Sequence, residues 1–213
     1  MKLLLKYLTL GLAAAASLAV MPLHAQPAGD KPLRIVVPFA AGGAQDVIAR
    51  YLGAKLTDKL GAPVIIDNKA GAGGIVAADA VAKATDGATV LLATGGAITI
   101  APHLQAKLPY DPMADLAPVA LVGDTPMTLA VRAESPYKTL ADVLRDAKAK
   151  PGQLTYASTG NGTVSHLTGA LLAQASGVNL LHVPYRGAAL GKVIAEDSQR
   201  WAKVIKQGGI KVD

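Results

Sequence analysis

Two glycine-containing loops carry the residues best suited to chemistry in this sequence. They are "PFAAGGAQD" (38–46) and "STGNGTVSH" (158–166), and each joins an apolar run to an amphipathic run. If these runs are a strand and a helix, each loop ends where several backbone N–H groups have no partner within the helix. Glycine allows a ligand to approach those groups closely, so both loops are suited to binding a carboxylate or a phosphate.

A third loop, "ATGGA" (93–97), has the same character. In an open parallel sheet, ligands bind beyond the carboxyl ends of the strands, where all three loops are expected to lie. A single glycine after a strand is more often only a tight turn, but three such loops at equivalent ends favour a shared binding role. Asp46 also has a structural interpretation, because an acidic residue in the first turn stabilises the helix dipole.

Motifs for other kinds of chemistry are incomplete. "GAGG" (71–74) departs from the dinucleotide-binding pattern, and the sequence contains no P-loop. The histidines lack metal-ligand spacing and there is no cysteine, so we expect no metal site and no cofactor. Ser165 and His166 are adjacent on the expected helix and do not face each other. An alternative function is a secreted α/β hydrolase-type enzyme using the anion site, whose candidate nucleophiles and bases are Ser158, Ser165, His166 and Asp46.

The N-terminus has the pattern of a secretory signal peptide. Lys2 and Lys6 precede an apolar core from Leu8 to Met21, and Ala25 ends a segment suited to cleavage. We expect removal of residues 1–25; an uncleaved membrane anchor is the alternative, although the core is short for one. The remaining chain has 19 basic and 15 acidic residues, a net charge of +4. The basic residues are scattered and not interleaved with aromatic residues, so we expect no nucleic acid partner.

Alternation of strand and helix patterns predicts a parallel α/β sheet in the first half of the chain. A continuous apolar strand such as Leu33–Val37 is typical of a sheet covered on both faces. The expected elements, in order, are strands Leu33–Val37, Val64–Asp67 and Thr89–Ala93, with helices Asp46–Leu60, Ile75–Ala84 and a short helix toward Leu104.

A proline-rich stretch then predicts a crossing into a second, thinner α/β lobe. Thr139 and Asp142 form a capping box at the start of one helix. The other expected elements are strands Val119–Val122, Thr128–Val131, Leu154–Ala157 and Leu180–Val183, and helices Thr163–Ala175 and Glu196–Gln207. We place lobe 1 at 26–114, with 196–213 returning to it as a C-terminal helix, and a partial lobe 2 at 115–190.

The ordered motifs of this chain resemble the Bug family of periplasmic solute receptors, which serve tripartite tricarboxylate transporters. They are "IVVPFAAGGAQD", "VIIDNKAGAGG", "DLAPVALVGDTPMTLAV", "YASTGNGTVSHLTGALL" and "LHVPYRG". The resemblance implies a monomeric, two-lobed Venus-flytrap protein of the type II-like class, located in the periplasm. Its partners are then a small carboxylate ligand and the membrane components of the transporter.

The resemblance also implies the ligand site, in which backbone amides, hydroxyls and bridging water hold the carboxylate. The site residues are Phe39, Ala41, Gly42, Gly43, Asp46, Thr94, Gly95, Ser158, Gly160, Asn161, Gly162, Thr163 and His166. The chain departs from the family after "VPYRGAAL", where roughly a hundred residues, about a domain's worth, are missing by an internal deletion near 190–196. We therefore expect an incomplete second lobe and weak or lost ligand affinity.

Overall fold

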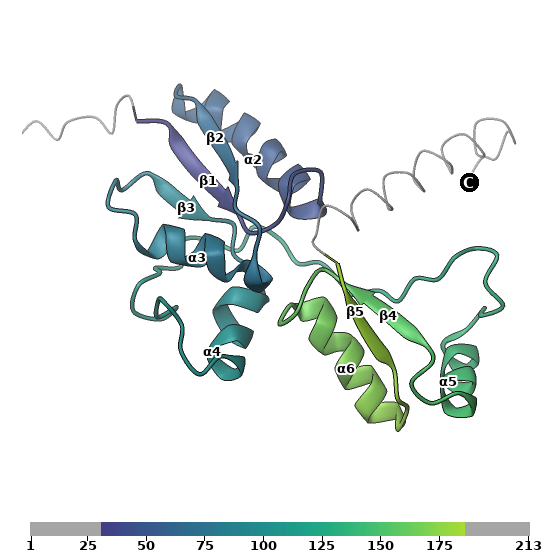
Figure 1. The fold of residues 1–213 in the computed structure, drawn as a ribbon. Helices are drawn as coiled ribbons and strands as arrows, with labels where there is room; N and C mark the ends of the chain where they lie inside the picture. The colour runs from purple at the N-terminus through teal and green to yellow at the C-terminus, as the bar shows by residue number, and fades with distance from the viewer. Residues whose placement is uncertain (1–30, 186–213) are drawn as a thin grey trace, which may run out of the picture. The chain divides into compact units, whose positions relative to one another are not determined.

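The computed structural model describes residues 31–185. The expected signal peptide, the junction near 190–196 and the expected C-terminal helix lie outside these residues. In the first sheet, β1 (Leu33–Val37) lies between β2 (Val64–Asn68) and β3 (Thr89–Leu91), and both pairings are parallel (Figure 1). The predicted parallel sheet is confirmed, with strand boundaries within two residues of those expected.

Helices cover both faces of the first sheet. Ile35 and Val37 pack with Ala49 of α2 (Ala44–Leu60) in one buried cluster, which also contacts Val90 of β3. The next residue of β3, Leu91, packs instead with Ala78 of α3 (Ile75–Ala82). Because successive strand residues point to opposite faces, α2 and α3 lie on opposite sides of the sheet.

Short turns of helix occupy the loops at the carboxyl ends of β2 and β3. A 3₁₀ turn, η1 (Ala72–Gly74), precedes α3, and a π-helical turn, η2 (Gly96–Ile100), leads directly into α4 (Ala101–Leu104). The expected short helix toward Leu104 is therefore present but begins with a widened turn. Within residues 31–185, none of the helices combines the length and apolar character needed to cross a bilayer.

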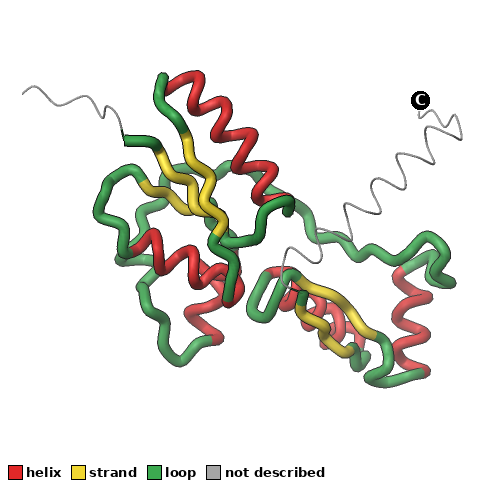
Figure 2. The backbone as a smooth tube through the Cα atoms, turned by 45° about the horizontal axis from the view of Figure 1, so that its top comes forward, coloured by secondary structure: helices red, strands yellow, loops and turns green. Residues whose placement is uncertain are grey.

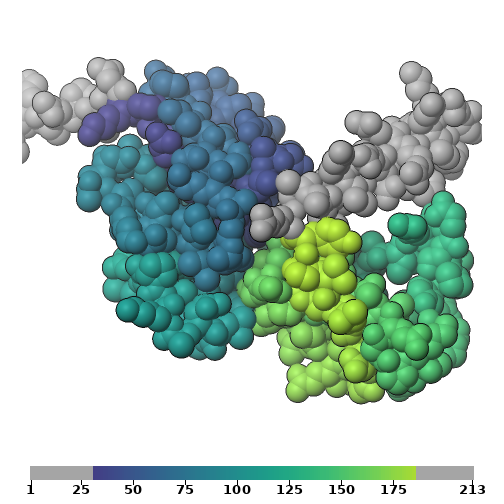
Figure 3. Space-filling model, in the orientation of Figure 1, coloured from purple at the N-terminus to yellow at the C-terminus, as the bar shows by residue number. Residues whose placement is uncertain are grey.

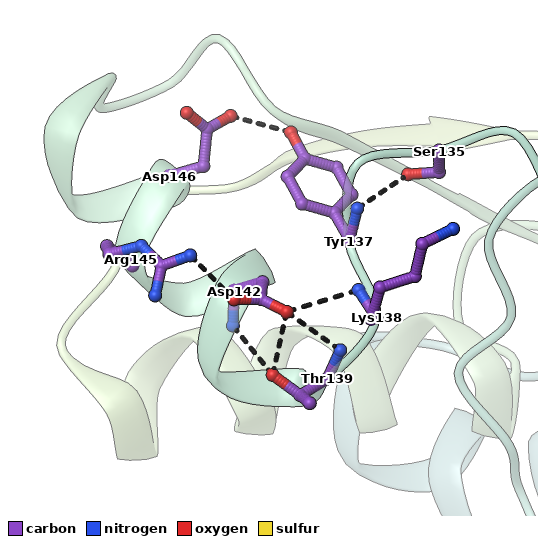
Figure 4. Close-up of polar contacts among 7 residues, drawn as sticks. All are labelled: Ser135, Tyr137, Lys138, Thr139, Asp142, Arg145 and Asp146. Carbon is purple, nitrogen blue, oxygen red and sulfur yellow. Dashed lines mark hydrogen bonds and ion pairs between the residues drawn. The ribbon is translucent and has the colours of Figure 1, made fainter.

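A second, smaller sheet follows in the chain. Its strands, β4 (Thr155–Ser158) and β5 (Leu181–Pro184), are parallel and are connected by α6 (Val164–Ser176). Both strands lie one residue beyond their predicted positions. The preceding helix, α5 (Leu140–Ala149), begins at the predicted capping box, in which Asp142 N donates to Thr139 Oγ1 at 3.2 Å and Thr139 N donates to the Asp142 carboxylate at 3.0 Å (Figure 4).

The two strands predicted at 119–122 and 128–131 are wrong. The backbone between residues 117 and 132 has no regular structure, as the loop colouring of Figure 2 shows. Its apolar side chains are exposed, including Val119 at 86% and Leu121 at 88%. Strand-forming residues need a partner strand, and among the described residues β4 and β5 pair only with each other. In the space-filling view of Figure 3, the part of the chain that follows this stretch, including α5, is coloured green.

Candidate functional site

The first predicted loop is held in place by Asp46. This side chain, only 3% exposed, lies in the first turn of α2. Its carboxylate accepts hydrogen bonds from Gly42 N at 2.9 Å, Arg50 Nε at 2.9 Å and Asn68 Nδ2 at 3.0 Å. Asn68 Nδ2 also donates to the carbonyl oxygen of Phe39 at 3.0 Å. Both carboxylate oxygens are therefore engaged by protein groups, and Asp46 fixes the loop from within.

The same contacts set the charge state of Asp46. Burial acts to raise the pKa of this carboxyl, but hydrogen bonds from Arg50, Gly42 and Asn68 together outweigh burial and lower it below its ordinary value. Asp46 is accordingly ionised at neutral pH, and the loop is locked by a charge-assisted network.

The N-terminus of α2 leaves donors free for a ligand. Gly43 is the N-cap residue, with φ −82° and ψ 170°, and as a glycine it has no side chain that could cap the helix. The first backbone N–H of the helix with a partner is that of Val47, which donates to the Gly43 carbonyl at 3.1 Å. Among the described residues, the N–H groups of Ala44 and Gln45 have no partner, as expected at a helix start. Ala41 and Gly42 lie next to them on the exposed part of the loop.

The loop after β3 adds an unpaired hydroxyl. Because β1 and β3 are parallel neighbours, Thr94 and Gly95 lie at the same edge of the sheet as the first loop. Thr94 Oγ1 is buried, yet it has no hydrogen-bond partner among the described residues. A buried polar atom without a partner is costly, so this oxygen needs a group that residues 31–185 do not supply.

The second predicted loop is closed on itself. The backbone N–H of Thr159 donates to Ser165 Oγ at 3.1 Å, and that of Gly162 donates to His166 Nδ1 at 3.2 Å. Gly160 N donates to Ser158 Oγ at 3.1 Å. Thr163 is the N-cap of α6, and its Oγ1 accepts the N–H of His166 at 3.4 Å. Among the described residues, the N–H groups of Asn161, Val164 and Ser165 are left without partners.

Close backbone contacts bring these loops together. A Cβ atom on Gly73 would lie 2.8 Å from the carbonyl oxygen of Asn161, and one on Gly96 would lie 2.7 Å from the carbonyl oxygen of Gly73. A Cβ on Gly74 would be 3.3 Å from that of Pro38. The "GAGG" segment thus touches all three predicted loops, a role that its sequence did not indicate. The glycines are needed because any side chain at Gly73 or Gly96 would collide with backbone.

A serine–histidine pair that the sequence did not reveal lies beneath the second loop. Ser158 Oγ is 2.7 Å from His182 Nε2, a distance typical of a nucleophile and its base. Ser158 is only 1% exposed, and its oxygen also accepts the N–H of Gly160. Ser158 Oγ also donates to the Gly160 carbonyl oxygen at 3.1 Å, so its hydrogen-bonding capacity is already used within the loop and the pair has a structural role. The pKa of His182 is lowered, mainly by burial and to a smaller extent by electrostatic repulsion between the two rings when His166 is protonated.

Two surface depressions lie away from the predicted residues. One of about 580 Å³ is lined by Val131, Arg132, Glu134, Ser135 and Tyr137. Another of about 400 Å³ follows α5, where Tyr137 Oη donates to Asp146 at 2.6 Å (Figure 4). Within residues 31–185, no cluster of histidine and acidic side chains is arranged to hold a metal ion.

Comparison with known proteins identifies the family. The family model for the tripartite tricarboxylate transporter family receptor matches residues 48–193. A UPF0065 protein of Bordetella pertussis is 41% identical over 190 residues, which cover 89% of this chain and 57% of that protein. Protein BugT of the same organism is 35% identical over 205 residues, which cover 92% of this chain and 63% of that protein.

Two solved structures show the same fold. The periplasmic binding protein BugD is 38% identical, with a TM-score of 0.71 over 79% of this chain and 56% of its own. MatC from Rhodopseudomonas palustris, solved with bound malate, is 36% identical, with a TM-score of 0.69 over 77% of this chain and 55% of its own. The chain thus spans between about half and two thirds of the length of the curated relatives it matches. It belongs to the receptor family of the tripartite tricarboxylate transporters, which confirms the resemblance to the Bug receptors.

Proposed function

We propose that this chain binds a small dicarboxylate at the carboxyl ends of β1 and β3. The observation that carries the proposal is the buried hydroxyl of Thr94, which has no partner among the described residues. A carboxylate oxygen placed beside it would accept the hydroxyl hydrogen and remove the cost of the unpaired atom. Thr94 lies at the loop edge where parallel sheets hold their ligands.

The free N–H groups at the start of α2 are the main charge-binding element. Those of Ala44 and Gln45 point outward from a helix that runs from Ala44 to Leu60, long enough to have a developed dipole. Such helix starts bind carboxylates without any basic side chain. The network around Asp46 keeps these donors in position, so little ordering is required when the ligand arrives.

The second loop supplies the opposing contacts through Asn161, Val164 and Ser165, whose N–H groups lack partners among the described residues. Its other donors are already bonded within the loop. A ligand that uses them must replace those bonds, which weakens the net gain. We therefore expect weak binding.

The family provides the setting for this proposal. MatC was solved with malate, a four-carbon dicarboxylate, and BugD is a periplasmic protein. By extension, this chain would act in the periplasm, as a monomer, and hand its ligand unchanged to the membrane components of the transporter. A positive net charge helps to attract an anion.

Thermal unfolding of the purified chain, with and without dicarboxylic acids of four to six carbons, tests the proposal. Binding to the folded state raises the melting temperature with ligand concentration. The diamides of the same acids are the control, because they match the acids in size but carry no charge. A rise with the acids and none with the diamides is expected; no rise with any acid would overturn the proposal.

Two variants locate the site. Gly43→Val should abolish the ligand-induced rise, because the new side chain blocks the start of α2. Gly43 has an ordinary φ and its Cβ would meet only the Ala40 carbonyl oxygen at 3.5 Å, so the variant should fold normally.

Thr94→Val keeps the shape of the side chain and removes the hydroxyl, and it should weaken binding while raising the stability of the free protein.

A further inference from the structure

A stack of rings attaches α6 to the second sheet. His166 of α6 lies on His182 of β5, with ring centroids 3.9 Å apart and planes within 16° of parallel. Tyr156 of β4 also lies next to His182, with ring centroids 5.0 Å apart. None of the residues of α6 is fully buried. Tyr156 Oη also donates to the carbonyl oxygen of His166 at 3.1 Å, so the rings and this hydrogen bond together join α6 to the second sheet.

Both histidines are also bonded to residues 158–163, the part of the second loop that precedes α6 (the 158–163 loop). His166 Nδ1 accepts the N–H of Gly162 at 3.2 Å, and His182 Nε2 is 2.7 Å from Ser158 Oγ. These bonds fix the loop near its beginning and near its end. The loop conformation and the ring stack are thus one structural unit.

The unit requires neutral rings. A ring nitrogen that accepts a hydrogen bond carries no hydrogen, whereas an imidazolium carries one on each nitrogen. Protonated His166 would place a hydrogen on Nδ1 facing the Gly162 N–H, so that bond would be lost. Protonated His182 would place a charge in a partly buried stack against a second imidazole.

The surroundings offer no charge to compensate. β4, β5, α6 and the 158–163 loop contain no acidic or basic residue apart from the two histidines. Tyr156 is the other titratable group that faces the stack, and burial raises its pKa, so it stays neutral over the range concerned. Burial lowers the pKa of His182, and a proton on His166 would lower it further, which agrees with a stack that disfavours protons.

We propose that His166 and His182 form an acid-sensitive latch on the 158–163 loop. While both rings are neutral the latch is closed; a proton on either ring releases the loop. The proposal rests on the proposed function only in taking this loop as part of the ligand site. Because the folded state lowers the pKa of His182 below its ordinary 6.5, the latch stabilises fully above pH 6.5 and loses strength as the pH falls from there through the lowered pKa.

Amide hydrogen exchange by NMR at two pH values tests the latch. Between pH 7.5 and pH 5.5, the protection factor of the Gly162 amide should fall about tenfold in the wild-type chain, the equivalent of one lost hydrogen bond. His166→Gln keeps a carbonyl acceptor that does not titrate, so its Gly162 amide should stay protected at both pH values. His103→Gln changes an exposed histidine of α4 and should behave like the wild type.

Ring titration and ligand binding complete the test. The ring signal of His182 should titrate below 6.5 in the wild type and higher in His166→Gln, because the neighbouring charge is removed. The latch would be overturned if the His182 ring signal titrated at its ordinary value and the protection of the Gly162 amide were the same at pH 7.5 and pH 5.5.

Malate affinity, measured by calorimetry, should fall on acidification in the wild type more than in His166→Gln. Comparing the two at the same pH cancels changes in the ligand's own charge. If malate binds at neither pH, the proposed function fails while the exchange data still decide the latch. Equal losses of affinity in both proteins would overturn the link between latch and ligand.

Discussion

The carboxylate of Asp46 accepts the backbone N–H of Gly42 at 2.9 Å, so the loop that precedes α2 is closed onto the first turn of the helix it leads into. Gly42 has a φ of +85°, a conformation that few other residues adopt. The bend at Gly42 and the charge at Asp46 therefore act together to present the free amides of the helix start.

Replacing Asp46 with alanine should destabilise the chain by about 2 kcal/mol, because it removes the buried, charged acceptor shared by Gly42, Arg50 and Asn68. Urea unfolding followed by circular dichroism measures the loss. Asp58→Ala, at an exposed position of the same helix, is the matched control and should change stability little. Equal stabilities of the two variants would show that the Asp46 network contributes nothing.

Gly96→Ala should cost about 2 kcal/mol, the usual scale of overpacking. The added methyl would lie 2.7 Å from the Gly73 carbonyl oxygen, and backbone must move to admit it. Gly123→Ala is the control, since nothing lies within 4 Å of its Cβ position. Thermal melting compares the two, and a Gly96→Ala chain as stable as wild type would contradict the close contact.

Thr163→Ala should reduce stability by about 1 kcal/mol, because α6 loses the hydroxyl that caps its first turn. Thr163→Ser retains the hydroxyl and should remain near wild type. Chemical denaturation of the three proteins distinguishes the roles of the hydroxyl and the methyl group; a serine variant as weak as the alanine variant would assign the effect to packing.

Acid should weaken the start of α5. Hydrogen bonds from the Thr139 side chain, then from Arg145 and the Lys138 backbone, lower the pKa of Asp142 to about 2 (Figure 4). The contribution of the carboxylate is therefore complete above pH 3.8 and is lost as the pH falls toward 2. The stability difference between wild type and Asp142→Asn should shrink over that range. A carboxyl NMR signal that titrates near its ordinary value would contradict the prediction.

The sequence predicted the first sheet well because its signals are local. Continuous apolar strands, helix starts and glycine stops specify β1, α2 and β2 without reference to the rest of the fold. The runs at 119–122 and 128–131 have equally good strand composition, but composition does not reveal whether a neighbouring strand exists. In this chain, none of the described residues provides one.

The candidate site was predicted in part for the same reason. Glycine loops before helices identified the backbone donors. His182 was missed because its contact with Ser158 depends on the parallel register of β4 and β5, which brings positions 24 residues apart together. Gly73 was missed because only the fold shows which backbone lies against it.

The stretch between Val119 and Val131 also has a practical consequence. It combines strand-forming residues, bare backbone groups and exposed apolar side chains, the features by which one polypeptide recruits strands from another. Self-association through such a stretch rises with protein concentration and falls on dilution. Affinities and melting temperatures of this chain should therefore be measured at several protein concentrations and extrapolated to the dilute limit, where the chain is monomeric.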